Sequence, residues 1–198
     1  MHPASSVIFF TTASGAGFGI MSWLCVAILM GHYTLTPHTI VMGVIGLVLA
    51  GAGLLSSTLH LGNPQRAWRA FSQWRTSWLS REGILAVLTC LNFAGILALY
   101  LTSGVVLPWM AGSCLVLSLL TIIATAMIYA QIKPVPRWHT KLTVLCYLGF
   151  STSTGIAVIA SVSPTRYHVY LAFGGLVLAW VFKLLWWQRA SRTSLSHD

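Results

Sequence analysis

Long apolar runs alternate with short polar segments along the whole chain. A helix needs about 20 apolar residues to cross roughly 30 Å of hydrocarbon, and six runs are long enough. They cover residues 6–31, 38–60, 83–102, 108–132, 139–162 and 168–187. The runs are continuous, whereas strands of a membrane barrel alternate apolar and polar residues over about ten positions. The pattern predicts an all-α integral membrane bundle of about six transmembrane helices, with residues 1–198 as a single transmembrane domain.

The connection between the second and third predicted spans has a different pattern. Asn63 followed by Pro64 is typical of a helix start, as an N-cap with proline at the first position. Aromatic residues then recur at spacings of three and four, with arginines between them: Trp68, Phe71, Trp74 and Trp78, and Arg66, Arg69 and Arg75. This predicts an interfacial amphipathic helix over residues 63–79, with its aromatic face on the membrane.

Two roles for this amphipathic helix remain open from the sequence. Basic and aromatic helices commonly anchor a protein to the lipid surface. Arginine and tryptophan are also favoured anchors of protein interfaces. The candidate residues for docking a partner are Arg66, Arg69, Arg75 and Trp74.

Charged residues are too few to coat a water-facing surface. They make up 7% of the chain, against roughly 25% in a soluble domain, and the mean hydropathy is +0.81. Eleven Lys and Arg face two acids, Glu82 and Asp198, for a net charge of +9. The bases lie between the apolar runs, which favours membrane topology over nucleic-acid binding as their explanation.

The bases are distributed very unequally between the two sides of the predicted membrane. One side has Arg166, and the other has Arg66, Arg69, Arg75, Arg81, Lys133, Arg137, Lys141, Lys183, Arg189 and Arg192. The positive-inside rule places the rich side in the cytoplasm. The prediction is a multi-pass protein of the inner (plasma) membrane, with both termini and the face for any partner in the cytoplasm.

Two ionisable residues flank the predicted amphipathic helix on the basic side. His60 ends the second span, and Glu82 precedes the third. Each has a structural alternative: Glu82 can favour the helix dipole, with Arg81 or Arg75 as its ion partner, and His60 can cap backbone carbonyls. Together they suit proton-coupled chemistry at the membrane interface, because histidine titrates near neutrality and an acid at the membrane edge is a functional candidate.

Quinone chemistry fits these residue types. A quinone exchanges two protons as it exchanges two electrons, and it needs an apolar slot for its flat ring. Trp68 and Trp78 could supply that slot, and His139 with Trp138 and Tyr129 forms a second candidate on the same face. No haem is expected, because all seven histidines lie at or outside the span ends. No metal site is expected either, since the four cysteines are scattered in apolar runs.

Four stretches resemble the dimethyl sulfoxide reductase membrane-anchor family. They read MHPASSVIFFTT at 1–12, HLGNPQRAWRAF at 60–71, WRTSWLSRE at 74–82 and AMIYAQIKPVPRWH at 126–139. The resemblance runs through most of the chain. It implies a haem-free anchor subunit of a three-part molybdenum oxidoreductase, whose catalytic subunit carries molybdopterin and whose second subunit carries four iron–sulfur clusters and docks on the anchor.

The resemblance also implies a quinone site on the anchor. The quinol-site histidine and glutamate of the family match His60 and Glu82, and the full candidate set is His60, Glu82, Arg81, Trp78, Trp68 and His139. The ligand would be ubiquinone or menaquinone. Members of the family usually have about eight spans, so the six predicted here depart from the pattern at the C-terminal side.

Charge placement favours a cytoplasm-facing complex of the sulfite dehydrogenase type, which reduces quinone. The alternative is an outward-facing complex of the dimethyl sulfoxide reductase type, which oxidises menaquinol. In either case the anchor is not catalytic toward the soluble substrate by itself. A small transporter would call for charges midway through the spans, which the sequence lacks, and a purely structural tether is the third class.

Overall fold

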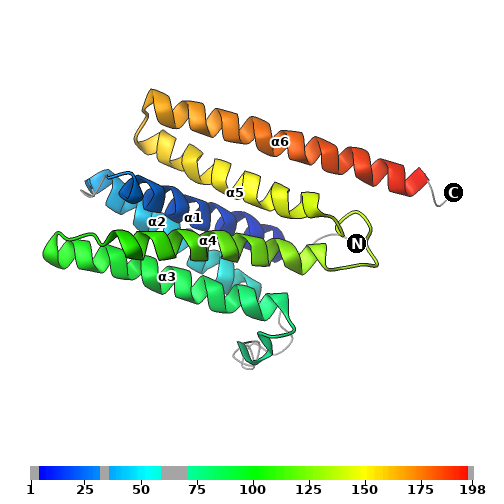
Figure 1. Cartoon of the computed structure of the whole chain (residues 1–198), viewed down its shortest axis with the longest axis horizontal. Coiled ribbons are helices and arrows are strands. Elements are labelled where there is room, and N and C mark those ends of the chain that lie inside the picture. The colour runs from blue at the N-terminus through cyan, green and yellow to red at the C-terminus, as the bar shows by residue number, and fades with distance from the viewer. Residues whose placement is uncertain (1–4, 32–35, 59–70, 196–198) are drawn as a thin grey trace.

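The computed structural model describes residues 5–31, 36–58 and 71–195, and these residues form six α-helices (Figure 1). The helices are α1 (Ser5–Leu29), α2 (Pro37–Thr58), α3 (Trp78–Ser103), α4 (Pro108–Ala130), α5 (Lys141–Val162) and α6 (Arg166–Leu195). Each contains a stretch long and apolar enough to cross a membrane. The predicted all-α membrane bundle of six spans is therefore confirmed.

The start of α3 lies earlier than the hydropathy pattern predicts. α3 begins at Trp78, whereas the predicted span begins at residue 83. Ser77 is the N-cap, and its hydroxyl accepts a hydrogen bond of 3.4 Å from the Ser80 backbone N–H. Serine satisfies an otherwise unpaired helix N–H in this way, so a polar residue rather than the first apolar one sets the boundary.

Of the predicted amphipathic helix at 63–79, residues 71–77 are not α-helical, and residues 78–79 belong to α3. Residues 63–70, and with them Arg66, Trp68 and Arg69, lie outside the described residues. Residues 71–73 form a short 3₁₀ turn and 74–76 a further turn. The N–H groups of Thr76 and Ser77 both bond to the Gln73 carbonyl, at 3.1 and 2.9 Å. The first bond is of the 3₁₀ type and the second closes a single α-type turn, and no regular α-helix runs through residues 71–77.

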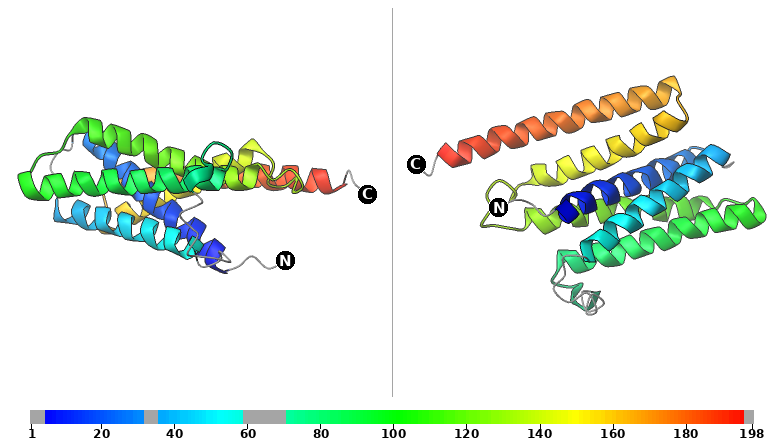
Figure 2. Two further views of the ribbon diagram at one scale, coloured as in Figure 1. Left: turned by 90° about the horizontal axis from the view of Figure 1, so that it is seen from below. Right: turned by 180° about the vertical axis from the view of Figure 1, so that it is seen from behind.

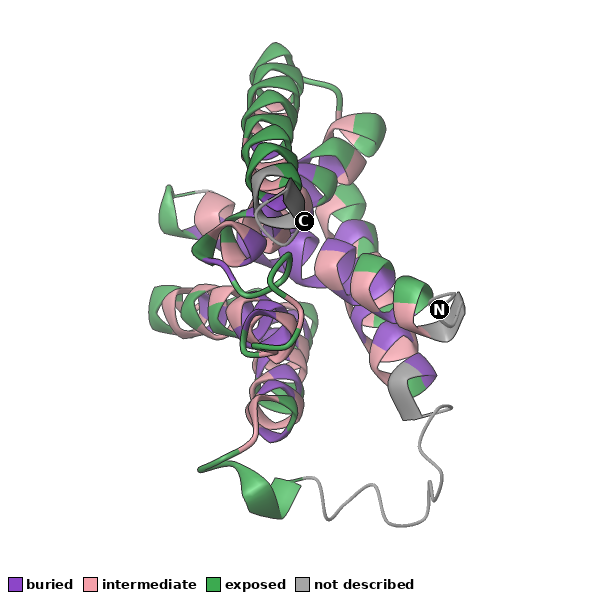
Figure 3. Ribbon diagram, turned by 90° about the vertical axis from the view of Figure 1, so that its right-hand side faces the viewer, coloured by how far each residue is buried: buried purple, intermediate pink, exposed green. Residues whose placement is uncertain are grey.

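Successive helices run antiparallel to one another, and α1 lies at the centre. α1 packs against α2, α4 and α5, while α3 packs on α4 and α6 packs mainly on α5 (Figures 1 and 2). α1 is the most buried span. α6 forms one edge of the bundle and is exposed along most of its length (Figure 3). α1 begins and α6 ends on the same side, where the turn at 71–77 before α3 and the connection before α5 also lie (Figure 1).

Glycine permits the close approach of α1 to its neighbours. A Cβ atom at Gly17 would lie 2.6 Å from the Gly46 carbonyl oxygen of α2, and one at Gly19 would overlap the Ser151 carbonyl of α5. Small residues are favoured at such contacts, because in lipid the attraction between helices comes from close backbone packing. The glycines of α1 therefore fix the position of the central helix, on which the site described next depends.

Candidate functional site

Glu82 lies on the buried face of α3. The buried residues of this helix include Glu82, Ala86, Thr89 and Phe93, at spacings of four, three and four. That spacing places them on one side of a helix, and this side packs against α4. The Glu82 side chain is 3% exposed, so an acid sits inside the protein near the end of the membrane span where the basic residues gather.

Thr125 of α4 supplies the hydrogen bond to this acid. The Thr125 hydroxyl contacts the Glu82 carboxyl directly and also lies 3.1 Å from the Thr121 carbonyl. A hydroxyl has one proton to donate. When Thr125 donates its proton to the Thr121 carbonyl, a protonated Glu82 can donate to the Thr125 oxygen. When Glu82 is ionised, Thr125 donates to the Glu82 carboxylate instead. The pair therefore accommodates Glu82 with and without its proton.

Arg81, the neighbour of Glu82, faces elsewhere. Its guanidinium donates to the carbonyls of Trp74 at 2.9 Å and Arg75 at 2.7 Å, and it lies 4.4 Å from the centre of the Trp78 ring. These contacts tie the turn at 71–77 to the start of α3. Arg81 and Trp78 thus stabilise the first turn of the helix, and within the described ranges no basic side chain is a partner of the Glu82 carboxyl.

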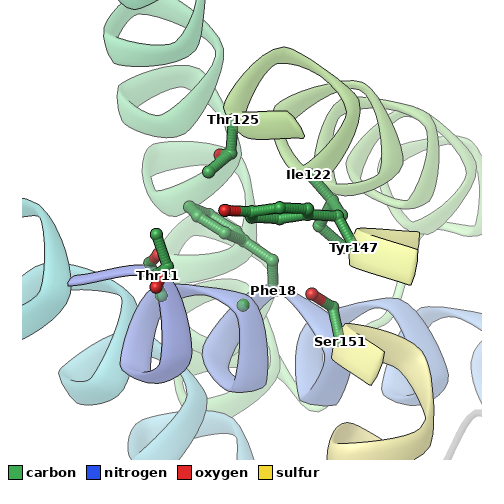
Figure 4. A pocket seen from close by; sticks show the side chains of 8 residues that line it. Thr11, Phe18, Ile122, Thr125, Tyr147 and Ser151 are labelled. Carbon is green, nitrogen blue, oxygen red and sulfur yellow. The ribbon is translucent and has the colours of Figure 1, made fainter. Parts of the chain in front are cut away.

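A narrow crevice begins on the other side of Thr125, between α1, α4 and α5. Its lining residues are Thr11, Ser14, Gly15, Phe18, Ile122, Thr125, Tyr147 and Ser151. Figure 4 shows the side chains of Thr11, Thr125 and Tyr147 turned into it. The crevice is closed to a water-sized sphere. Thr125 thus separates the buried acid from a dry, mostly apolar gap with hydroxyl groups on its walls.

A cavity of about 230 Å³ continues from this crevice at the same end of the bundle. It shares Thr11 and Tyr147 with the crevice, and its other lining residues are Val7, Ile8, Tyr129, Trp138, Thr143, Cys146, Lys183 and Trp186. The Tyr129 and Tyr147 rings stack at a centroid distance of 5.7 Å. Tyr147 lines the crevice together with Thr125, which contacts the Glu82 carboxyl, so the acid adjoins the crevice that leads to this cavity.

Lys183 of α6 brings a positive charge to the outer wall of the cavity. Its Nζ lies 4.1 Å from the centre of the Trp186 ring, a cation–π contact. Trp186 in turn donates from Nε1 to the Thr143 hydroxyl oxygen at 3.3 Å. We call Glu82, Thr125, Tyr147, Tyr129 and Lys183, with the crevice and the 230 Å³ cavity between them, the Glu82 site.

The other predicted quinone-site residues are placed as follows. His60 and Trp68 lie outside the described residues. His139 is exposed, and its Nδ1 donates to the Ala130 carbonyl at 2.7 Å, which caps the end of α4. Neither His139 nor Trp78 lines the crevice or the cavity. Of the described members of the predicted set, the structure brings Glu82 alone to this site.

The two described docking candidates lie at the surface. Trp74 is 53% exposed, and the guanidinium of Arg75 lies 5.5 Å from the centre of its ring. Both belong to the turn at 71–77, directly before the helix that carries Glu82. A partner bound to this turn would therefore lie next to the Glu82 end of the bundle.

Sequence reasoning missed Thr125, Tyr147 and Lys183 as site residues. One signal for Thr125 was present: Thr121 and Thr125 are four residues apart in an apolar span, which places two hydroxyl groups on one helix face. Tyr147 gave no such signal. It reaches the site because α5 packs beside α4 and α1, an arrangement that no local pattern specifies.

Comparison with known proteins adds a family and one relative. A family model described as DMSO reductase anchor subunit (DmsC) matches residues 1–186. A protein of Allochromatium vinosum that is named as a subunit of sulfite dehydrogenase is 37% identical over 194 residues, an alignment that covers 88% of this chain and 59% of the relative. The chain thus spans about three-fifths of the length of that relative. No solved structure matches.

Proposed function

Because the chain belongs to the DMSO reductase anchor subunit family, we propose that it holds a molybdenum oxidoreductase on the membrane and exchanges electrons with quinone at the Glu82 site. One observation carries the proposal. A buried acid, bonded to a hydroxyl that accommodates both of its protonation states, stands beside an aromatic cavity at the basic end of the bundle. The 230 Å³ cavity suits a flat ring, and the exposed apolar surface beyond it suits a lipid-soluble tail.

The residues of the site have distinct roles in this proposal. Quinone bound there supplies the redox chemistry, in which two electrons and two protons convert it to quinol. Tyr147, Tyr129 and Lys183 can donate hydrogen bonds to a quinone oxygen. Glu82 gives a proton toward the quinone through the Thr125 hydroxyl and takes its replacement from water at the basic end of the bundle, and His60 is the second proposed proton carrier. The closed crevice excludes water between Glu82 and the cavity, so proton movement across it is confined to the side chains of Thr125 and Tyr147.

The proposed partners are an iron–sulfur subunit with four clusters and a molybdopterin-bearing catalytic subunit. Arg75 and Trp74, with Arg66 and Arg69 from the sequence prediction, form the proposed docking surface. Since this surface adjoins the Glu82 site, electrons from a docked cluster would enter near the quinone. The basic end faces the cytoplasm in this proposal. The relative is named as a sulfite dehydrogenase subunit, which supports a complex that oxidises its soluble substrate and reduces quinone.

The proposal is tested with Glu82→Gln and His60→Ala in the assembled complex. We expect both variants to keep oxidation of the soluble substrate with an artificial acceptor. Quinone reduction should fall at least tenfold in each, because the introduced amide carries no acid proton to exchange and His60 is the second proposed proton carrier. Thr102→Val is the control, since Thr102 lies at the far end of α3 and its hydroxyl bonds to carbonyls of that helix.

Two results would contradict the proposal. Unchanged quinone reduction in Glu82→Gln would remove Glu82 from the mechanism. A parallel loss of the artificial-acceptor activity would show that the substitution disrupts assembly with the catalytic subunit and not quinone exchange.

A further inference from the structure

A second cavity, larger than the first, lies at the opposite end of the bundle. Its volume is about 580 Å³, within the range of small-molecule sites, and it lies where α1 gives way to α2 and α5 to α6 (left in Figure 1). It shares no lining residue with the Glu82 site. Nothing in the proposed function uses it.

The lining of this cavity combines apolar and polar side chains. Trp23, Met42 and Ile159 belong to the apolar part, and His38 and His168 are among the polar groups. Among the described residues that line it, none is Lys, Arg, Asp or Glu. A phospholipid headgroup would therefore find no Lys or Arg for its phosphate among these residues, whereas an uncharged ring with hydrogen-bonding groups matches the mixed lining.

His168 has its hydrogen-bonding roles fixed by the end of α5. Its Nδ1 lies 2.9 Å from the Ser163 carbonyl, and a carbonyl only accepts, so Nδ1 carries the proton. In the neutral ring Nε2 is then an acceptor. Ser163 follows the last residue of α5, and its own N–H bonds to the Ile159 carbonyl at 2.9 Å. The helix end therefore fixes the tautomer, and the neutral form of this lining residue offers Nε2 as an acceptor to a ligand.

An acceptor of this kind selects a ligand that carries a hydroxyl group. We propose that the 580 Å³ cavity is a second quinone-pool site that binds the reduced form, with His168 accepting a hydrogen bond from a quinol hydroxyl. The aromatic ring would lie against Trp23 and Met42. This inference does not depend on the proposed function, because it concerns a different cavity at the other end of the bundle.

The test is photolabelling of the intact complex in lipid nanodiscs with a light-activated quinol analogue. We expect label on peptides that contain residues 36–42 or 163–171. Unlabelled quinol should compete for this labelling. The dimethyl ether of the same quinol should compete at least tenfold less well, since it has no hydroxyl proton to donate to His168.

Four variants make the test specific. His168→Leu removes the acceptor and Ala27→Phe fills the cavity, because Ala27 lines it, so each should reduce the labelling at least tenfold. Val169→Phe is the matched control: Val169 is exposed and does not line the cavity, so labelling should be unchanged. Glu82→Gln should also leave the labelling unchanged. The test of this cavity is therefore independent of whether the proposal for the Glu82 site is right.

Three results would overturn the proposal: absence of label in these peptides, equal competition by the ether, or undiminished labelling in His168→Leu. A phospholipid that is retained by the wild-type complex in native mass spectrometry and lost from Ala27→Phe would also overturn it. If Ala27→Phe does not assemble with its partners, His168→Leu and the ether comparison still decide the question.

Discussion

Glu82 has a single hydrogen-bond partner among the described side chains, the Thr125 hydroxyl. A buried polar group that loses its partner costs about 1–3 kcal/mol, and more when it is charged. Thr125 therefore does two things in our proposal, since it satisfies the acid and connects it to the crevice. Both effects depend on one oxygen atom.

Thr125→Val should uncouple the complex from quinone while Thr125→Ser should not. Valine keeps the shape of threonine but removes the hydroxyl, so we expect quinone reduction to fall roughly tenfold or more, in line with about 1–3 kcal/mol. Serine restores the hydroxyl and should recover most of the rate. The measurement is quinone reduction by the intact complex, with an artificial-acceptor assay alongside.

Thr89→Val is the matched control for this prediction. Thr89 bonds to Thr121 at 3.2 Å in the same α3–α4 interface, about two turns from Glu82. Its substitution removes an equivalent hydroxyl without touching the acid. Equal losses in Thr125→Val and Thr89→Val would show that packing of the interface, and not the bond to Glu82, controls the rate.

At the residue scale, the sequence predicted the acid but not its surroundings. Glu82 could be identified because it is one of two acids in the whole chain. Trp78 and Arg81 are predicted members of the quinone site; in the structure they contact each other at the start of α3, and neither lines the crevice or the cavity. Tyr147, which is far from Glu82 in the sequence, lines the crevice beside Thr125 because α5 packs against α1 and α4.

At the scale of elements, glycine pairs set the distance between helices. A Cβ atom at Gly19 would overlap the Ser151 carbonyl, while one at Gly51 has nothing within 4 Å. Backbone atoms cannot move aside as the end of a flexible side chain can. The same glycine-to-alanine change should therefore have opposite effects at the two positions.

Gly19→Ala should destabilise the protein, and Gly51→Ala should not. Overpacking costs about 1–3 kcal/mol, so we expect the midpoint of thermal unfolding in detergent to fall by several degrees for Gly19→Ala. At Gly51 alanine has space and is the better helix former by roughly 0.5–1 kcal/mol, so the midpoint should stay or rise. A Gly19→Ala protein as stable as the wild type would mean that α1 and α5 are not in this contact in the membrane.

Hydropathy predicted which elements exist, and local hydrogen bonds decided where they end. Six apolar runs gave six helices, because span length follows from bilayer thickness. The start of α3 was placed too late, at 83 instead of 78, since hydropathy does not register the Ser77 cap. The end of α6 at Leu195 lies beyond the predicted 187, because a helix can continue past the apolar region.

At the scale of the whole molecule, the described basic residues gather at one end. Arg75, Arg81, Lys133 and Arg137 lie at the end where α2 finishes and α3 begins, and Arg166 lies at the other. In our proposal the first end faces the cytoplasm, as the positive-inside rule predicts. This assignment separates the two candidate complexes, because the docking surface must face the compartment of the soluble subunits.

Reporter fusions should confirm the cytoplasmic orientation. We expect a green fluorescent protein fused after residue 198 to fluoresce, and alkaline phosphatase inserted at the exposed Gly104, in the connection between α3 and α4, to be active outside the cytoplasm. The same two reporters exchanged between the positions serve as the control. The reverse pattern would contradict the charge argument and favour an outward-facing complex that oxidises quinol.

The central place of α1 has a consequence for how the protein is made. α1 leaves the ribosome before α4 and α5, which later surround it. The glycine-containing face of α1 therefore stays covered by lipid or by the insertion machinery until α5 has been synthesised and inserted. A chain that stalls before α5 would display that face in the bilayer, where quality-control proteases could recognise the unfinished anchor before its soluble partners bind.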